Sequence, residues 1–134
     1  MLGREIGHEI GQQTGVRVLP DPQHGIVMEV SVHAEGSLLG THYDDHTTYR
    51  SWEEADGTIR GSGHGIVAGE DGEQATWEGM GAGTRQGDGS VQFRGALFYR
   101  SRTPRFSEIN GRCCVFEYDV DPGGKSEGRF WLWE

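Results

Sequence analysis

Short segments that alternate apolar and polar residues, separated by glycine-containing turn signals, are the feature that most constrains how this chain can fold. The pairs Asp56-Gly57, Asp71-Gly72 and Asp88-Gly89 each stand between two such segments. Asp-Gly in that setting is typical of a tight β-hairpin, because glycine adopts the positive φ that the turn requires. Since tight hairpins join neighbouring antiparallel strands, the pattern predicts a largely sequential antiparallel topology.

Eight segments have the length and alternation of β-strands. We therefore expect an all-β fold, a closed antiparallel barrel of about eight strands, with a β-sandwich as the alternative. Thr103-Pro104 is typical of a helix start and Asn110-Gly111 of a helix end, which predicts one short helix over 104–110. The expected strands are Thr14–Leu19, Ile26–Ala34, Thr41–Trp52, Thr58–Ala68, Glu73–Gly83, Ser90–Arg100, Arg112–Val120 and Arg129–Trp133.

The first thirteen residues have a different pattern from the rest of the chain. Leu2, Ile6 and Ile10 recur every four residues, which would place an apolar stripe on a helix. Three glycines in the same stretch would destabilise such a helix by roughly 1 kcal/mol each. Residues 1–13 are therefore equally consistent with a short docked helix and with a frayed tail, whereas residues 14–134 are expected to form a single β-barrel domain.

Charge, hydropathy and cysteine usage exclude several classes of protein. The 134-residue chain has a formal net charge of −9 and a single lysine, Lys125, so it offers no basic surface for nucleic acid or an anionic membrane. No apolar run approaches the roughly 20 residues of a membrane span, and no signal-peptide pattern is found. Cys113 and Cys114 would point to opposite faces of a strand, which argues against a disulfide between them. Free thiols without a targeting signal favour the cytoplasm.

Two neighbouring strands each carry one nearly bare face, which indicates space inside the barrel. Large side chains from across the barrel could fill that space, and a ligand could fill it instead; structural filling is slightly favoured. Trp77, Tyr99 and Trp131 are typical of core or wall positions, and in a pocket they would supply aromatic surface with polar tips. The two faces read Ile59, Gly61, Gly63, Gly65, Val67 and Ala75, Trp77, Gly79, Gly81, Gly83.

The C-terminal strands are apolar on both faces. On one strand Cys114, Phe116 and Tyr118 oppose Cys113 and Val115, and on the other Trp131 and Trp133 oppose Phe130 and Leu132. One face can serve the interior of the barrel, so something must cover the other. We expect a homo-oligomer whose subunit interface covers it, with the N-terminal segment as the competing cover.

Six further segments carry a resemblance to a known family. They are Arg17–Pro20, Ser37–Gly40, Ala75–Gly79, Phe93–Tyr99, Ile109–Gly111 and Val115–Asp121. These segments resemble a family of small bacterial proteins of unknown function, associated with the allene-oxide-cyclase-like (calycin-type) barrel. The resemblance covers most of residues 14–134 and implies an eight-stranded antiparallel barrel and an oligomer. Relatives of that barrel include cofactor-free cyclases of reactive polyunsaturated or polyketide substrates. The chain departs from the family pattern in its histidine-rich third strand.

Three charged residues stand mid-strand in apolar surroundings: Glu29, Arg94 and Glu117. A buried charge is costly unless it is paired, so inward-facing side chains at these positions would be functional candidates. Arg94 could pair with a carboxylate or bind an anionic substrate group, and a desolvated Glu117 could act as a general acid or base. Strand alternation makes solvent-facing side chains at least as consistent with the sequence.

The pattern His42-x-Asp44-x-His46 places three metal-ligand types on one strand face, and His33 or His64 could complete a set. The outer two positions are about 13 Å apart at roughly 3.3 Å per residue, so one ion cannot easily bind all three. A solvated outer face is therefore the favoured interpretation, with the alternate face of the strand directed inward.

His64 lies between glycines, which leaves its ring accessible, and an ordinary surface position is the favoured alternative. The glycine spacing around it is no dinucleotide fingerprint, because no helix follows.

These observations predict a barrel that binds an apolar or polyunsaturated small molecule in its lumen. As an enzyme it would be an isomerase or cyclase that needs no cofactor and no metal, and it would fold the substrate into a reactive conformation. The alternatives are a non-catalytic carrier and a structural oligomer with a filled barrel. The predicted catalytic residues are Glu117, Arg94 and Glu29, and the predicted ligand-binding residues are Trp77, Tyr99, His64, Tyr49 and Trp131.

Overall fold

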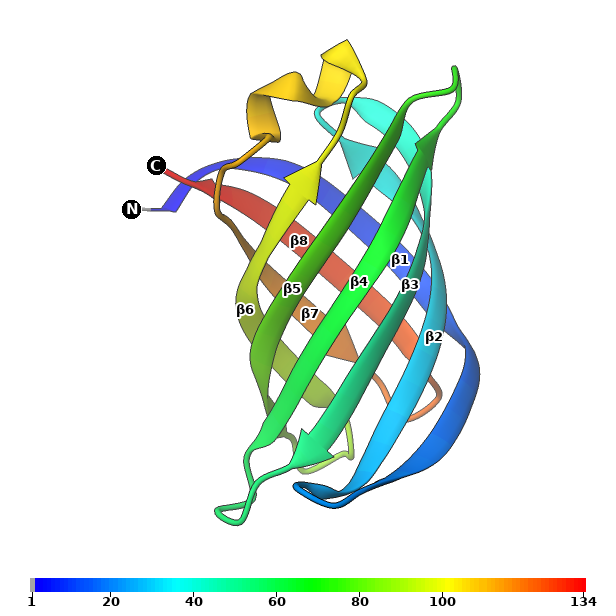
Figure 1. Ribbon diagram of the computed structural model, residues 1–134, viewed down its shortest axis with the longest axis vertical. Helices are drawn as coiled ribbons and strands as arrows, with labels where there is room; N and C mark the ends of the chain where they lie inside the picture. The colour runs from blue at the N-terminus through cyan, green and yellow to red at the C-terminus, as the bar shows by residue number, and fades with distance from the viewer. Residues whose placement is uncertain (1) are drawn as a thin grey trace.

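A computed structural model describes residues 2–134, which form a closed barrel of eight antiparallel strands in sequential order (Figure 1). The predicted all-β barrel is thereby confirmed, and the sandwich alternative is wrong. No helix among the described residues is long and apolar enough to cross a membrane. The elements are β1 Leu2–Asp21, β2 Gly25–Leu38, β3 Thr41–Glu53, β4 Ile59–Gly69, β5 Gln74–Arg85, β6 Val91–Arg100, the 3₁₀ helix η1 Pro104–Ile109, β7 Cys114–Val120 and β8 Lys125–Trp133.

The Asp-Gly pairs form tight turns, as their sequence predicts. Gly57 and Gly89 have φ values of 87° and 91°, in the left-handed region that favours glycine. In both turns the aspartate accepts a hydrogen bond from the backbone N–H two residues on, at 3.0 Å for Asp56 and 2.9 Å for Asp88. Turn chemistry therefore sets the sequential order of the strands.

The N-terminal segment is part of the barrel rather than a docked helix or a tail. Residues 2–13 form the first part of β1 and pair with β8 on one side and β2 on the other, while Met1 lies outside the described residues. The pairing with β8 shifts register on both sides of Glu5, and such bulges break strict alternation. Ile6 is buried, whereas Leu2 and Ile10 are exposed, so the period of four does not mark a helix face.

One end of the barrel is closed by η1 and a hydrophobic cluster (Figure 1). Phe106 and Ile109 of η1 are fully buried against this cluster, which includes Leu38, Leu97 and Leu132. The predicted helix over 104–110 is confirmed in position, although it is a 3₁₀ helix. Thr103 does not cap it with its side chain; the Thr103 hydroxyl instead accepts a hydrogen bond from the Gln74 N–H at 3.0 Å.

A smaller cluster lies toward the other end. Ile59, Phe93 and Val120 are buried there, with Phe116 and Tyr118 packed against them. The two clusters leave a middle layer of the barrel interior in which polar and aromatic side chains meet.

Cys114 is buried in the core and Cys113 is half-buried, and both are free thiols, in agreement with the expected opposite orientation. Burial raises the pKa of the Cys114 thiol to about 11, which makes it a poor nucleophile near neutrality.

Candidate ligand-binding site in the barrel interior

The middle layer of the barrel contains a cavity of about 70 Å³ with predominantly apolar walls. Glycine faces of β4 and β5 form part of its wall, and most of the space above those glycines is occupied by aromatic rings. A Cβ added at Gly63 would lie 2.8 Å from the Tyr49 Cβ, and one at Gly81 would lie 3.0 Å from the Phe116 Cζ. The barrel is thus partly filled by its own side chains and partly empty. The lining side chains include Tyr49, Trp77, Phe93, Leu97, Phe116, Tyr118 and Phe130, together with Glu9, Asp45 and Thr47.

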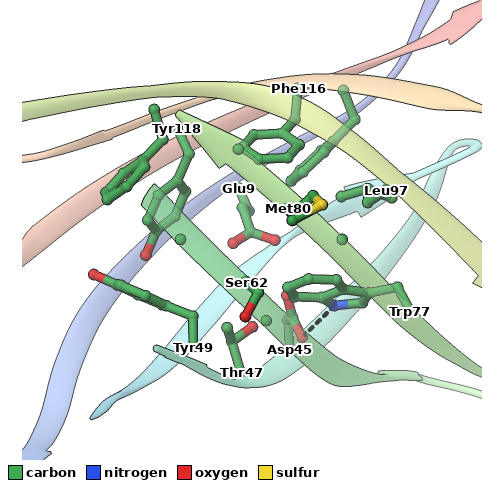
Figure 2. Close-up of a pocket in the computed structure, with 16 residues that line it drawn as sticks. Glu9, Asp45, Thr47, Tyr49, Ser62, Trp77, Met80, Leu97, Phe116 and Tyr118 are labelled. Atoms are coloured by element: carbon green, nitrogen blue, oxygen red, sulfur yellow. Dashed lines mark hydrogen bonds between the residues drawn. The ribbon is translucent and has the colours of Figure 1, made fainter. Parts of the chain in front are cut away.

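Two buried carboxyl groups, Glu9 on β1 and Asp45 on β3, lie within hydrogen-bonding reach of each other at this cavity (Figure 2). Glu9 is 4% exposed and Asp45 is 3% exposed. The Tyr43 hydroxyl donates to Glu9 Oε1 at 2.7 Å, and the Trp77 indole Nε1–H donates to Asp45 Oδ1 at 3.3 Å. We refer to Glu9 and Asp45 below as the carboxyl pair.

A single glycine makes this arrangement possible. Gly36 of β2 pairs with Glu9 of β1 on one side and with Tyr43 of β3 on the other. A Cβ on Gly36 would lie only 2.7 Å from the Glu9 Cα. Because Gly36 has no side chain, the Tyr43 hydroxyl can reach across β2 to Glu9.

Burial alters the proton affinity of the carboxyl pair. Desolvation, followed by the charge of Asp45, raises the pKa of Glu9 to about 8. Desolvation also raises the pKa of Asp45, while hydrogen bonds from Trp77 and Thr47 oppose that rise. Because the charge of Asp45 is among the causes that raise the pKa of Glu9, Glu9 is the member of the pair that keeps its proton to higher pH. No Lys, Arg or His among residues 2–134 lines the cavity to balance a negative charge on the pair.

Among residues 2–134, the buried hydroxyl groups of Tyr118 and Ser126 make no hydrogen bond of normal length, and the two lie near enough to each other for Ser126 to lower the pKa of Tyr118 against the larger rise that burial causes. Tyr118 lines the cavity, and its ring lies edge-to-face against Tyr49 with centroids 6.1 Å apart (Figure 2). An unpaired buried hydroxyl costs free energy, so a bound molecule that hydrogen-bonds to it would be stabilised.

Of the aromatic residues that the sequence singles out, Tyr49 and Trp77 line the cavity, and Tyr99 lies inside the barrel one layer away. Tyr99 is buried in the cluster closed by η1, and burial raises its pKa well above the ordinary value. Trp131 is half-buried on β8, one position from the inward-facing Phe130, so its side chain is on the outer face.

The three mid-strand charged residues do not line the cavity. Arg94 and Glu117 lie on the outer face, each nearly half exposed, with Arg94 Nε 3.4 Å from Glu117 Oε2. Arg94 also donates from Nη1 to Asp119 Oδ1 at 2.8 Å. Glu29 accepts a hydrogen bond from Arg17 Nη2 at 2.7 Å, and this contact is the main reason its pKa is lowered. Ion pairs on the surface, rather than a role in the lumen, thus account for these charges.

The histidines of the third strand also lie on the outer face. His42 and His46 are exposed, and His46 stacks on His33 of β2 with ring centroids 4.8 Å apart. The donor atoms of His33, Glu35 and Asp44 lie within 4.8 Å of one another, a set of nitrogen and oxygen ligands that a divalent cation accepts. His33 Nε2 and Asp44 Oδ1 form a hydrogen bond of 2.8 Å. The solvated-face interpretation therefore describes this strand.

His64 is likewise on the outer face, in a surface depression lined by residues of β2–β6, and it does not line the cavity.

Sequence reasoning missed the carboxyl pair, for a different reason in each case. Glu9 falls in the stretch that reads as a helix or a tail, so no strand face was assigned to it. Asp45 shares a face with Tyr43, Thr47 and Tyr49, and alternation alone would have found it once that face was assigned to the interior.

Comparison with solved structures identifies the fold. The chain superposes on a protein of unknown function from Clostridium acetobutylicum with a TM-score of 0.84 and 12% identity, covering 98% of this chain and 97% of the other. A conserved protein of unknown function from Rhodopseudomonas palustris gives 0.81 and 10%, covering 99% of both. A β-barrel-like protein from Acinetobacter baumannii gives 0.83 and 9%, covering 100% and 96%. No family model and no curated protein matches the chain. These likenesses show a β-barrel fold shared with three bacterial proteins, two of which are described as of unknown function.

Proposed function

We propose that this protein binds a small, mostly apolar molecule inside the barrel, with the carboxyl pair as its polar contact. The observation that carries the proposal is a desolvated pair of carboxyl groups at an apolar cavity that no basic side chain of residues 2–134 lines. A pair of this kind is costly to folding, and costly polar groups in apolar pockets are typical of binding sites.

The size of the cavity limits the guest. A buried water requires about 10–15 Å³ of such volume, so 70 Å³ holds about five to seven waters, or a compact molecule with a similar number of non-hydrogen atoms. An extended polyunsaturated chain would require the aromatic walls to move, so a compact guest is the better match.

A second candidate function is acid–base isomerisation, the reaction class implied by the allene-oxide-cyclase-like resemblance. It is favoured by one observation, a buried Glu9 carboxyl whose pKa is raised to about 8 beside a second buried carboxyl, Asp45, at the same cavity. Asp45 would take a proton from one carbon while Glu9 gives a proton to another, so the reaction changes no proton count and needs no cofactor. Arg94, Glu117 and Glu29 have no part in this chemistry, since they face outward.

The test is native mass spectrometry of protein purified from its own host, followed by denaturing extraction and identification of the released molecule. Leu97→Phe fills the cavity from β6, and the adjacent Phe98→Leu changes the outer face of the same strand as a matched control. We expect a stoichiometric organic mass that is lost in Leu97→Phe and kept in Phe98→Leu. A mass retained equally by both variants would contradict binding in the lumen. Turnover of the released molecule by the apo protein would favour isomerisation over carriage.

A further inference from the structure

The oxygen atoms at the cavity can each accept a hydrogen bond from a bound molecule. Oxygens of Glu9, Asp45, Thr47 and Tyr118 are at its surface, and the Tyr118 hydroxyl makes no hydrogen bond of normal length within residues 2–134. The neighbouring donors are already committed, because the Tyr43 hydroxyl donates to Glu9 and the Trp77 indole donates to Asp45. An ionised carboxylate can only accept, and the hydroxyl oxygens can accept as well, so a molecule that donates several hydrogen bonds satisfies these groups together.

The charge of the cavity points in the same direction. The charge of Asp45 is one of the causes that raise the pKa of Glu9 to about 8, so the pair carries a negative charge while Glu9 titrates, and among residues 2–134 no basic side chain lines the cavity. The nearest histidine along β3, His46, is exposed on the outer face. A desolvated carboxylate with no cation beside it is strongly stabilised by a positively charged guest.

The walls suit a cation as well as an apolar body. Rings of Tyr49, Trp77, Phe93, Phe116 and Tyr118 surround the cavity, and the faces of aromatic rings attract ammonium groups. The same rings offer apolar contact to a small hydrocarbon group. Figure 2 shows the carboxylate of Glu9 directed into the space between these rings.

We propose that the guest is a small organic ammonium ion, a protonated amine on a compact apolar body, with its N–H groups donating to the carboxyl pair and to the Tyr118 hydroxyl. This inference rests on the proposed function and specifies the chemical class of the bound molecule. A neutral alcohol of the same shape has one donor in place of three and no charge, so it satisfies the site less completely.

The experiment compares protonated amines with alcohols of the same shape. Isobutylamine and isobutanol, and then isopentylamine and isopentanol, are titrated into the apo protein at pH 7.5 and followed by calorimetry. We expect each amine to bind at least about tenfold more tightly than its alcohol, since a charged hydrogen bond is roughly twice as strong as a neutral one. An alcohol that binds as tightly as its amine overturns the ammonium proposal and leaves lumen binding intact. Binding of neither class overturns both proposals.

Two variants locate the preference. Asp45→Asn keeps the shape of the side chain and removes its charge, so we expect the amine-to-alcohol affinity ratio to fall several-fold while alcohol binding persists. Glu9→Gln removes the charge that Glu9 gains above its pKa of about 8, so we expect it to lower the ratio more at pH 9 than at pH 7.5. Glu117→Gln, the same change on the outer face, serves as the matched control and should keep the wild-type ratio. An unchanged ratio in both lumen variants overturns the proposal.

The wild-type protein supplies a test that needs no variant. An alkylammonium group keeps its proton up to about pH 10, so affinity for the amine should rise about several-fold from pH 6 to pH 9 as the pair ionises. Alcohol affinity should not rise. The other titratable groups near the pair are tyrosines whose pKa values burial raises, so they stay neutral over this range: Tyr43, Tyr49, Tyr99 and Tyr118. An amine affinity that is independent of pH overturns the proposal.

Discussion

Glu9 is the residue whose chemistry depends most on the fold. Its carboxyl group is nearly inaccessible to water, and burial raises its pKa to about 8, against about 4.5 in an unfolded chain. Between those values the folded protein holds a proton that the unfolded chain has released. By linkage, the free energy of unfolding then falls as pH rises, at about 1.4 kcal/mol per pH unit for one proton.

This linkage predicts how Glu9→Gln changes the pH dependence of stability. The wild-type protein should lose stability progressively from about pH 5 to pH 8 and level off above pH 8. Glu9→Gln should remove most of that slope, because the amide does not titrate. Urea unfolding at pH 6, 7 and 8 measures the difference.

The wild-type slope alone is not sufficient evidence. The net negative charge of the chain, −9 with neutral histidines, also increases with pH, and its self-repulsion destabilises the folded state. The comparison therefore includes Glu127→Gln, whose carboxyl has a lowered pKa on the outer face through its hydrogen bond with His8. That variant should keep the wild-type slope over this range. Parallel slopes for wild type and Glu9→Gln would contradict the raised pKa.

At the residue scale, the sequence predicts the aromatic residues of the cavity wall better than it predicts the polar residues at the site. Tyr49 and Trp77 are among the predicted ligand-binding residues and line the cavity, whereas Trp131 lies on the outer face. Glu117 and Arg94 are mid-strand charges of the kind that marks a site, yet cross-strand pairing satisfies them on the surface. Which face of a strand is inside is decided by all its neighbours together, and no single strand carries that information.

At the element scale, strand β2 requires a glycine at position 36, because the Tyr43 hydroxyl reaches Glu9 through the space that a side chain there would occupy. Gly36→Ala should destabilise the protein by about 2–3 kcal/mol, the range typical of overpacking, since its Cβ would meet the β1 backbone. Gly15→Ala, a strand glycine with nothing within 4 Å of an added Cβ, should change stability by less than about 1 kcal/mol. Chemical denaturation of the two variants side by side measures both effects, and equal losses would contradict the packing at Gly36.

Hairpins were predictable from local signals, whereas β1 was not. Asp56-Gly57 and Asp88-Gly89 each specify a turn through the positive φ of the glycine and one hydrogen bond to the aspartate. Both features depend only on residues within the turn, so the local sequence predicts them. The first strand gains its partners from β2 and from β8, more than a hundred residues away, and its bulges around Glu5 hide the alternation. The local sequence of β1 does not indicate that it pairs with β8.

At the scale of the whole molecule, an apolar row crosses the outer face of β5–β8. Met80, Ala96, Val115 and Trp131 are successive cross-strand partners, and Met80 is 61% exposed. The N-terminal segment is a strand beside β8, so it does not cover this row. We propose that a second copy of the chain covers the row in a homo-oligomer, as the two-sided apolar pattern of the C-terminal strands predicts.

Paired substitutions test this proposal. Val115→Glu places a charge in the centre of the apolar row and should shift the protein to monomer. Val16→Glu makes the same change at an exposed position on β1 away from the row, and should leave the oligomer intact. Light scattering coupled to size-exclusion chromatography measures the mass of each. A wild-type monomer, or an oligomer that survives Val115→Glu, would contradict the proposal.

The pairing of β1 with β8 has a consequence for how the barrel forms. Every other neighbouring pair is consecutive along the chain, but this seam joins positions as far apart as Leu2 and Trp133. Loop closure favours nearby contacts, so the seam should close last in folding. Glu9 and Asp45 meet within the first three strands, while Phe116 and Phe130 of the aromatic wall arrive with the last two. Water leaves the acid pair only at that final step, so at neutral pH the closing of the barrel should be accompanied by the uptake of a proton from solution.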